Sequence, residues 1–122
     1  MDVKNLLIST LADEYDYKII LQGSLTENDR YPDSFFTYFN NDSSSADFFD
    51  NEETVTIWDF DLNFYSVNPT LVNTVLLGAK AKLKEAGFIV EGKGYDVLSD
   101  EPSHTGRGIN VMYMEREVEN NA

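Results

Sequence analysis

Side chains that commonly carry out catalysis are scarce in this sequence. It contains one histidine, His104, and no cysteine. A single imidazole cannot form a histidine cluster for zinc, and it allows only one centre for a nucleophilic triad. Neighbouring side chains on an extended backbone diverge, so we do not expect Ser103 to place its hydroxyl on the imidazole of His104. We therefore interpret the segment around His104 as a structured connection and not as a catalytic site.

The only paired carboxylates worth weighing are Asp59 and Asp61. Residues two apart on a strand share a face, so both could reach one divalent cation. A hard cation needs six or more oxygen ligands, and the sequence shows no constraining loop that would supply them. We expect these residues to form the solvent-facing side of a half-buried strand. The short segments 92–94 and 106–108 each place a base between two glycines, but neither has the spacing of a phosphate-binding loop, and we interpret both as turns.

Charge and composition limit the classes of protein to which this chain can belong. Asp and Glu number 22 against 9 Lys and Arg, a net charge of −13, so basic patches for binding a phosphate backbone are scarce. The excess acid keeps a surface soluble, or it repels or mimics nucleic acid. Hydrophobic residues make up 42% and aromatic residues 13% of the chain, which predicts a folded core. The absence of cysteine is compatible with a reducing cytosol, and we expect neither a secretory signal nor a membrane span.

The hydrophobic pattern predicts one α+β domain spanning residues 1–122, with the order α-β-β-β-α-β-β. We expect a mostly antiparallel sheet with two helices packed on one face. The clearest helix covers 69–86, with Asn68 as its N-cap, Pro69 at its first position and Gly87 after its end. The first helix covers 3–15, and polar segments at 40–51 and 117–122 predict an acidic loop or arm tip and a flexible tail. Strands are expected at 18–22, 34–40, 53–66 and 108–115, and the segments 88–91 and 95–98 are expected to be strand material interrupted at 92–94, which this order counts as one strand.

The strand at 53–66 has a change of phase. Trp58, Phe60 and Phe64 fall on one face, but the apolar residues Val55 and Ile57 fall on the other. A β-bulge, or an outer half that packs on something other than the main core, would explain this change. A long strand pair flanking an acidic tip is also the geometry of an arm that reaches a neighbouring subunit. Apolar residues that leave the core in this way require a partner.

From Phe35 to Arg116 the sequence resembles the tail-completion or tail-terminator proteins of long-tailed, siphovirus-like bacteriophages and prophages of Gram-positive bacteria. The matching features are the aromatic strand 34–39, the strand 54–66, the Asn68-Pro69 helix start, and the segments 86–88, 94–96 and 104–108. These features concern the local residue composition and the order of helices and strands, and they include no catalytic signature.

The resemblance implies a structural virion protein with no enzymatic activity and no cofactor, assembled in the host cytoplasm. It implies a ring, usually of six copies, that caps the tail tube, contacts the tail tube protein and the head-neck connector protein, and lets DNA pass without specific binding. An acidic lumen would repel that DNA. An alternative function is an acidic DNA-mimic inhibitor of a DNA-binding protein. The residues expected to contact other subunits or partners are Phe48, Phe49, Asp50, Glu52, Glu53, Val55, Ile57, Glu101, His104 and Arg107.

Overall fold

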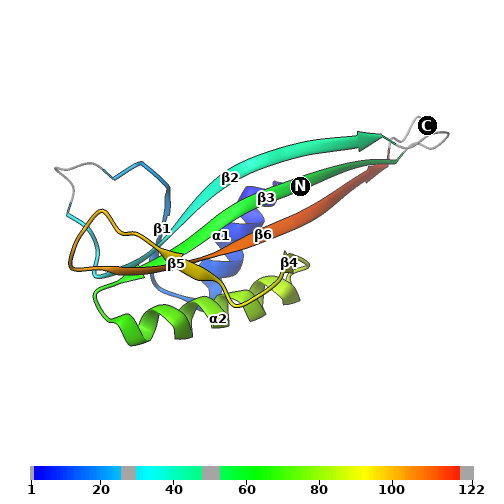
Figure 1. Ribbon diagram of the computed structural model, residues 1–122. Helices are drawn as coiled ribbons and strands as arrows, with labels where there is room; N and C mark the ends of the chain where they lie inside the picture. Colours follow the sequence, from blue (N-terminus) through cyan, green and yellow to red (C-terminus); the bar gives the residue numbers. More distant parts are fainter. Residues whose placement is uncertain (1, 26–29, 48–52, 119–122) are drawn as a thin grey trace.

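The computed structural model describes residues 2–25, 30–47 and 53–118, and it shows an α+β fold with both helices on one face of a single sheet (Figure 1). The six strands follow the order β1-β2-β3-β6-β4, and β5 also pairs with β6. Only β1 and β2 are parallel. The fold class is therefore as predicted, with one strand more, because the interval 88–98 forms two short strands. The elements are α1 (Val3–Glu14), β1 (Lys18–Leu21), β2 (Ser34–Asp47), β3 (Glu53–Ser66), α2 (Pro69–Glu85), β4 (Ile89–Val90), β5 (Tyr95–Val97) and β6 (Thr105–Val118).

Helix α2 begins at the cap that the sequence predicts, and Asp2 caps α1 in the same way. The side chain of Asn68 accepts a hydrogen bond from the Thr70 backbone N–H at 3.1 Å, and Asp2 accepts one from the Asn5 N–H at 3.2 Å. These bonds satisfy donors that a helix start otherwise leaves unpaired. Helix α2 ends before Gly87, whose φ of 102° lies in the left-handed region that favours glycine.

The main core lies between the helices and the inner face of the sheet. Phe60, Leu62 and Phe64 alternate along β3 and are fully buried against the helices. The ring of Phe64 lies 4.8 Å from that of Phe36 and 5.1 Å from that of Tyr17, measured between centroids. This aromatic cluster joins the sheet to the chain segment that follows α1.

The polar stretch predicted as a loop at 40–51 is strand as far as Asp47. Strand β2 pairs with β3 from Ser34↔Ser66 to Asp47↔Thr54. Backbone pairing along a long partner strand does not depend on apolar side chains, and this explains why β2 continues through residues that disfavour strands. Strand β6 likewise continues to Val118, so 117 and 118 are strand and not tail. Residues 48–52 and 119–122 lie outside the described part of the chain.

The change of phase in β3 does not come from a bulge in that strand. Pairing between β3 and β6 runs without a shift from Glu53↔Val118 to Ser66↔Thr105. The irregularity lies in β2, between Asn40 and Asp42. Strict alternation along β3 consequently places Val55 and Ile57 on the face opposite the helices. This geometry favours the other alternative, that the outer half of the strand packs on something other than the main core.

Candidate interaction surface

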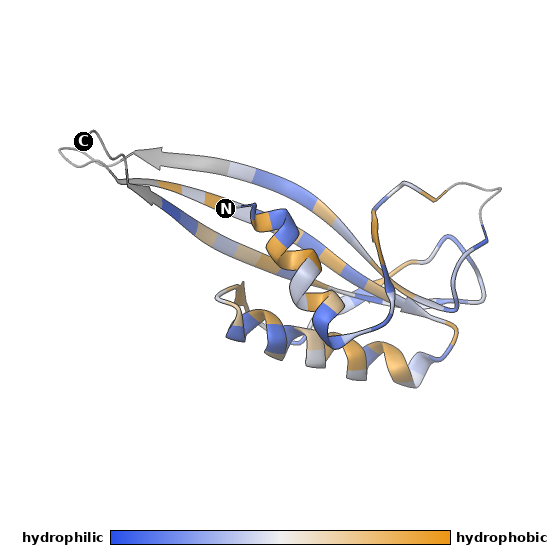
Figure 2. Cartoon of the chain, turned by 180° about the vertical axis from the view of Figure 1, so that it is seen from behind, coloured by the Kyte–Doolittle hydropathy of each residue, from blue (hydrophilic) through white to orange (hydrophobic). Residues whose placement is uncertain are grey.

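Three strands extend beyond the helices and form an arm, which we define as residues 39–47, 53–58 and 113–118 (Figures 1 and 2). The main core ends where the arm begins. Its last fully buried members in the central strands are Phe60 in β3 and Val111 in β6, and Trp58 and Tyr113 pack partly against it. The arm is therefore held by strand pairing, with little contribution from the helices.

The outer face of the arm, which points away from the helices, carries an apolar strip. Ile57 pairs directly with Met114, and Val55 pairs with Arg116, so these side chains share one face. Met114 is 42% exposed, whereas Val55 is only 1% exposed although it does not belong to the main core cluster. The described, accessible members of the outer apolar strip are Phe39, Ile57 and Met114; Val55 is already buried within the chain, and Met112 lies just before the arm in β6.

The inner face at the base of the arm is occupied by an internal contact. The indole Nε1 of Trp58 donates a hydrogen bond to the Glu115 carboxylate at 3.1 Å, and the Trp58 ring stacks on Phe60. Glu115 is buried. A charge-assisted bond of this kind fixes two neighbouring strands relative to each other. The base of the arm is thus pre-organised.

Both outer strands of the arm have an open edge within the described residues. Strand β1 covers the edge of β2 only as far as Tyr38, where Gln22 adds one last backbone hydrogen bond. Strand β4 covers β6 only at Val111 and Met112. Beyond these points the described segments 39–47 and 113–118 pair with β3 alone. Unpaired strand edges are templates for pairing with another chain.

The predicted contact residues fall into two groups at opposite ends of the sheet. Val55 and Ile57 lie on the arm, and Glu53 begins β3 opposite Val118. The other end holds the predicted trio from the segment that leads into β6, close to the pair Ser66↔Thr105. The structure does not bring the two groups together. Phe48, Phe49, Asp50 and Glu52 lie outside the described residues, and the trio at the other end is Glu101, His104 and Arg107.

His104 holds its connection in place. Its Nε2 donates a hydrogen bond to the Pro32 carbonyl at 2.8 Å, and its ring packs against Tyr31 and Phe35. The prediction that Ser103 would not reach this imidazole is wrong, because the Ser103 Oγ lies 3.0 Å from Nδ1. The backbone forms a turn here, closed by the bond from the His104 N–H to the Glu101 carbonyl, so adjacent side chains converge.

Arg107 joins β6 to the segment before it. Its guanidinium donates to the Asp96 carboxylate at 2.8 Å and to the Lys93 carbonyl at 2.9 Å. The flanking glycines are strand residues and not a turn, contrary to the prediction. A Cβ on Gly106 would lie 2.6 Å from the Tyr65 ring, and one on Gly108 would lie 2.2 Å from the Asn63 side chain. Glycine is needed at both positions because side chains from β3 lie directly against the β6 backbone.

Replacing Gly106 with alanine is expected to lower the free energy of unfolding by about 1–3 kcal/mol, the usual range for overpacking. The added methyl group would overlap the Tyr65 ring and the Val97 side chain, 2.8 Å away. Urea denaturation checks this loss. In a Tyr65→Ala background the same substitution should cost clearly less, because the larger obstacle is gone. Equal costs in the two backgrounds would contradict the contact.

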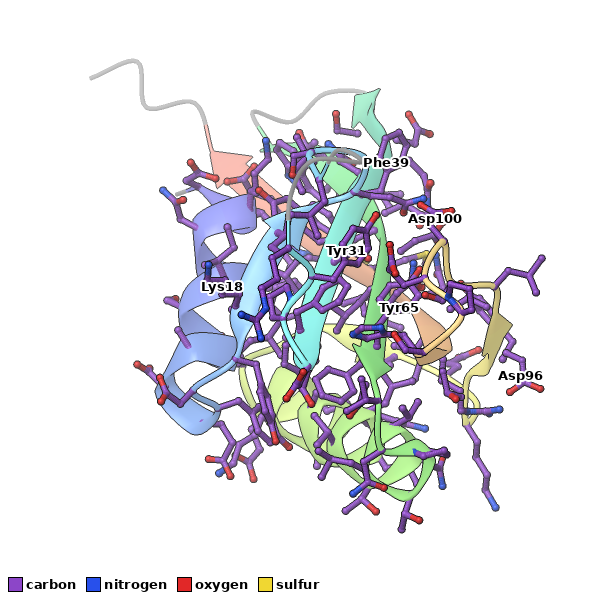
Figure 3. The ribbon with its side chains drawn as sticks, turned by 90° about the vertical axis from the view of Figure 1, so that its left-hand side faces the viewer. Lys18, Tyr31, Phe39, Tyr65, Asp96 and Asp100 are labelled. Atoms are coloured by element: carbon purple, nitrogen blue, oxygen red, sulfur yellow. The ribbon has the colours of Figure 1, made fainter. Side chains whose placement is uncertain are left out.

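A second surface feature is a hollow at the base of the outer face, between the segments 20–25 and 98–100. Figure 3 shows Tyr31, Tyr65 and Asp100 close together there, with Phe39 further along β2. Burial raises the pKa of the Tyr65 phenol above its ordinary value, and the Asp100 carboxylate raises it further. The nearby side chains of Thr37 and Asn63 partly offset this rise in pKa.

The raised pKa of Tyr65 predicts a loss of stability in alkali. Below about pH 10 the phenol is protonated in both the folded and the unfolded chain, so it contributes no pH dependence. Above that pH the unfolded chain ionises first, and the free energy of unfolding falls as the pH rises. Tyr65→Phe should make this fall shallower in urea denaturation measured between pH 9 and pH 11. Identical slopes for the variant and the wild type would contradict the prediction.

In the acidic pair at the centre of the outer face, Asp59 is bound by amides and Asp61 lies beside the Tyr95 phenol. The Asp59 carboxylate accepts hydrogen bonds from the side-chain amides of Asn110 and Asn41. Burial, together with Asp61 and Asp59, raises the pKa of Tyr95. Among the described residues there is no group of three or more histidine or acidic side chains that would hold a metal ion. The arrangement is that of a hydrogen-bonded polar surface.

A comparison with protein-family models gives no match, and a comparison with curated protein sequences gives none either. In the part of the chain that the structure describes, neither helix combines the length and the hydropathy needed to cross a membrane. The arm, the hollow and the charge of the chain are the features of the described structure that bear on function.

Proposed function

We propose that this chain is a structural assembly protein that joins copies of itself through the arm, as a tail-terminator or tail-completion protein does. The observation that carries the proposal is the arm itself, a three-stranded ribbon with an apolar outer strip and two open edges in its described residues. Beyond Trp58 and Tyr113 at its base, an extension of this kind adds little to the main core of its own subunit. Its apolar strip and strand edges are suited to contact with a neighbouring subunit.

The position of the arm suits a ring. It lies at one end of the sheet, and the body of helices and loops lies at the other (Figure 1). If the arm of one subunit contacts the body of the next, the contact joins two different surfaces. Such head-to-tail contacts close into a ring when the rotation between subunits allows it. The resemblance to tail-terminator proteins supports a ring that caps the tail tube and joins it to the head-neck connector in the virion.

The charge of the chain supports a role beside DNA without binding it. With 22 acidic and 9 basic residues, the chain has few cations to neutralise phosphates. Acidic side chains around a channel would repel the DNA backbone and keep the genome mobile within it. The proposal assigns no catalytic residue and no cofactor.

Electron microscopy of tail tubes tests the proposal. Tubes assembled from the tail tube protein alone are mixed with the purified chain, and a ring at one end of each tube is the expected result. Uncapped tubes, together with salt-sensitive binding of the chain to a DNA-binding protein, would contradict it and favour the DNA-mimic alternative. The arm variant described in the Discussion serves as the negative control.

A further inference from the structure

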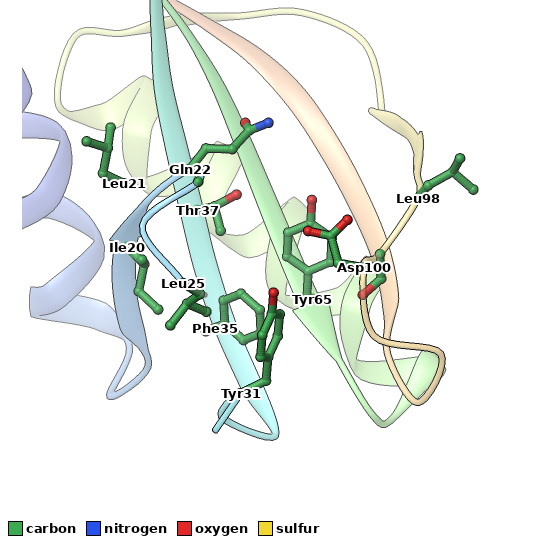
Figure 4. A pocket seen from close by; sticks show the side chains of 12 residues that line it. Ile20, Leu21, Gln22, Leu25, Tyr31, Phe35, Thr37, Tyr65, Leu98 and Asp100 are labelled. Atoms are coloured by element: carbon green, nitrogen blue, oxygen red, sulfur yellow. The ribbon is translucent and has the colours of Figure 1, made fainter. Parts of the chain in front are cut away.

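The hollow at the base of the outer face has aromatic and polar walls, and it is distinct from the arm. Its volume is about 130 Å³. Phe35 and Tyr65 are cross-strand partners with stacked rings, and Tyr31 meets Phe35 edge to face (Figure 4). Asp100 lies at one side of the hollow and Thr37 at another. The residues that line it belong to four separate segments of the chain.

One buried hydroxyl on the wall of this hollow can accept a further hydrogen bond. Thr37 is only 7% exposed, and its hydroxyl interacts with the Tyr65 phenol. Its hydroxyl points toward Tyr65 and Asp100 (Figure 4). A hydroxyl that bonds one neighbour keeps acceptor capacity, so Thr37 can accept a hydrogen bond from a donor outside the chain.

The groups around the hollow select the charge of that donor. The Thr37 hydroxyl and the Asp100 carboxylate are acceptors, and the aromatic faces attract cations. The whole chain carries a net charge of −13. Arg30, which precedes Tyr31 in the sequence, is exposed and does not line the hollow. The site is therefore complementary to a cation supplied by another molecule.

We propose that this hollow binds an arginine side chain of a partner protein. A guanidinium is planar and stacks on aromatic rings, and it carries five N–H donors that can bond Asp100 and Thr37 at once. Two leucines on the rim, Leu21 and the 97% exposed Leu98, provide apolar contact for the residues beside that arginine. Arginine binding in the hollow does not require the proposed ring of subunits, because the arm and the hollow are separate surfaces.

The test uses small probes and nuclear magnetic resonance. N-acetyl-arginine methylamide is titrated into the folded chain, and saturable shifts are expected at the backbone amides of Thr37, Tyr65 and Asp100. The citrulline analogue has nearly the same shape without the charge, and it should bind at least tenfold more weakly. Equal binding of the two probes would overturn the proposal.

Variants of the chain test whether the probe binds in the hollow. Asp100→Asn should lower the affinity for the arginine probe about tenfold, and Thr37→Val should lower it about threefold. Asp13→Asn removes an exposed charge from α1 and should leave the affinity unchanged. If Asp13→Asn weakens binding as much as Asp100→Asn does, the probe is attracted by the overall charge and the hollow is not its site. Spectra of the free variants confirm that each is folded.

The leucine rim distinguishes a protein partner from a free cation. A Leu-Arg-Leu peptide with blocked ends should bind several-fold more tightly than a Ser-Arg-Ser peptide. Leu98→Ser should reduce this advantage and leave the affinity for the arginine probe unchanged. If the two peptides bind equally, the occupant is a small cation and not a protein segment.

Discussion

Replacing Phe64 with alanine is expected to lower the free energy of unfolding by about 3–5 kcal/mol, the range for removing a buried phenylalanine. Phe64 is fully buried in the centre of the sheet, and its ring contacts Phe36 and Tyr17. The substitution removes the ring on which the segment after α1 packs and leaves a cavity. Since a domain of this size has a total stability of about 5–15 kcal/mol, the loss approaches the whole of it for a marginally stable chain.

Urea denaturation followed by circular dichroism measures this loss. Phe39→Ala is the matched control, because Phe39 lies on the same strand as Phe36 but is exposed on the outer face. Its replacement should change the free energy of unfolding by no more than about 0.5 kcal/mol. A loss below about 1 kcal/mol for Phe64→Ala would show that the aromatic cluster is not the centre of the core.

Replacing Ile57 and Met114 together with aspartate is expected to weaken self-association at least a hundredfold, a change of about 2.8 kcal/mol in the free energy of association. The two residues are cross-strand partners on the outer face of the arm. Contact with a neighbour would bury two carboxylates, and the single base on this face of the described arm, Arg116, could offset only one of them, so their desolvation is costly. Neither residue belongs to the main core cluster, so the fold should remain.

The control for this variant is Leu77→Asp, which introduces a carboxylate at an exposed position of α2. It tests whether added negative charge alone disrupts association in a chain that is already acidic. Sedimentation velocity should show unchanged association for Leu77→Asp and loss of association for the arm variant. Equal losses would mean that charge, and not the arm, governs assembly.

Local signals in the sequence are enough to predict the helices, because their hydrogen bonds join residues that are close in the sequence. Helix α2 is predicted to within one residue, because Asn68 and Gly87 act through hydrogen bonds and dihedral preferences within a few residues of each end. The length of β2 is not predictable in this way. Its residues 40–47 are polar, and only pairing with β3, distant in the sequence, makes them a strand.

The interaction surfaces are predictable only in part. The change of phase at Ile57 and Trp58 correctly indicates apolar side chains that leave the core, because alternation along a strand is a local rule. The hollow is not predictable, since Ile20, Phe35, Tyr65 and Asp100 come together only through the sheet order and two long connections. One missed signal was available. Gly106 and Gly108 within a strand pattern indicate close backbone approach, and here they make room for Tyr65 and Asn63.

The most direct test of the central claim is the mass of the chain in solution, measured by light scattering over a concentration series, alone and with tail tubes. We expect the wild type to assemble to a mass of several chains, on its own at high concentration or on the tubes. The Ile57→Asp, Met114→Asp double variant should stay at the mass of one chain under the same conditions. A wild-type chain that remains single at every concentration, with tubes present, would contradict assembly through the arm.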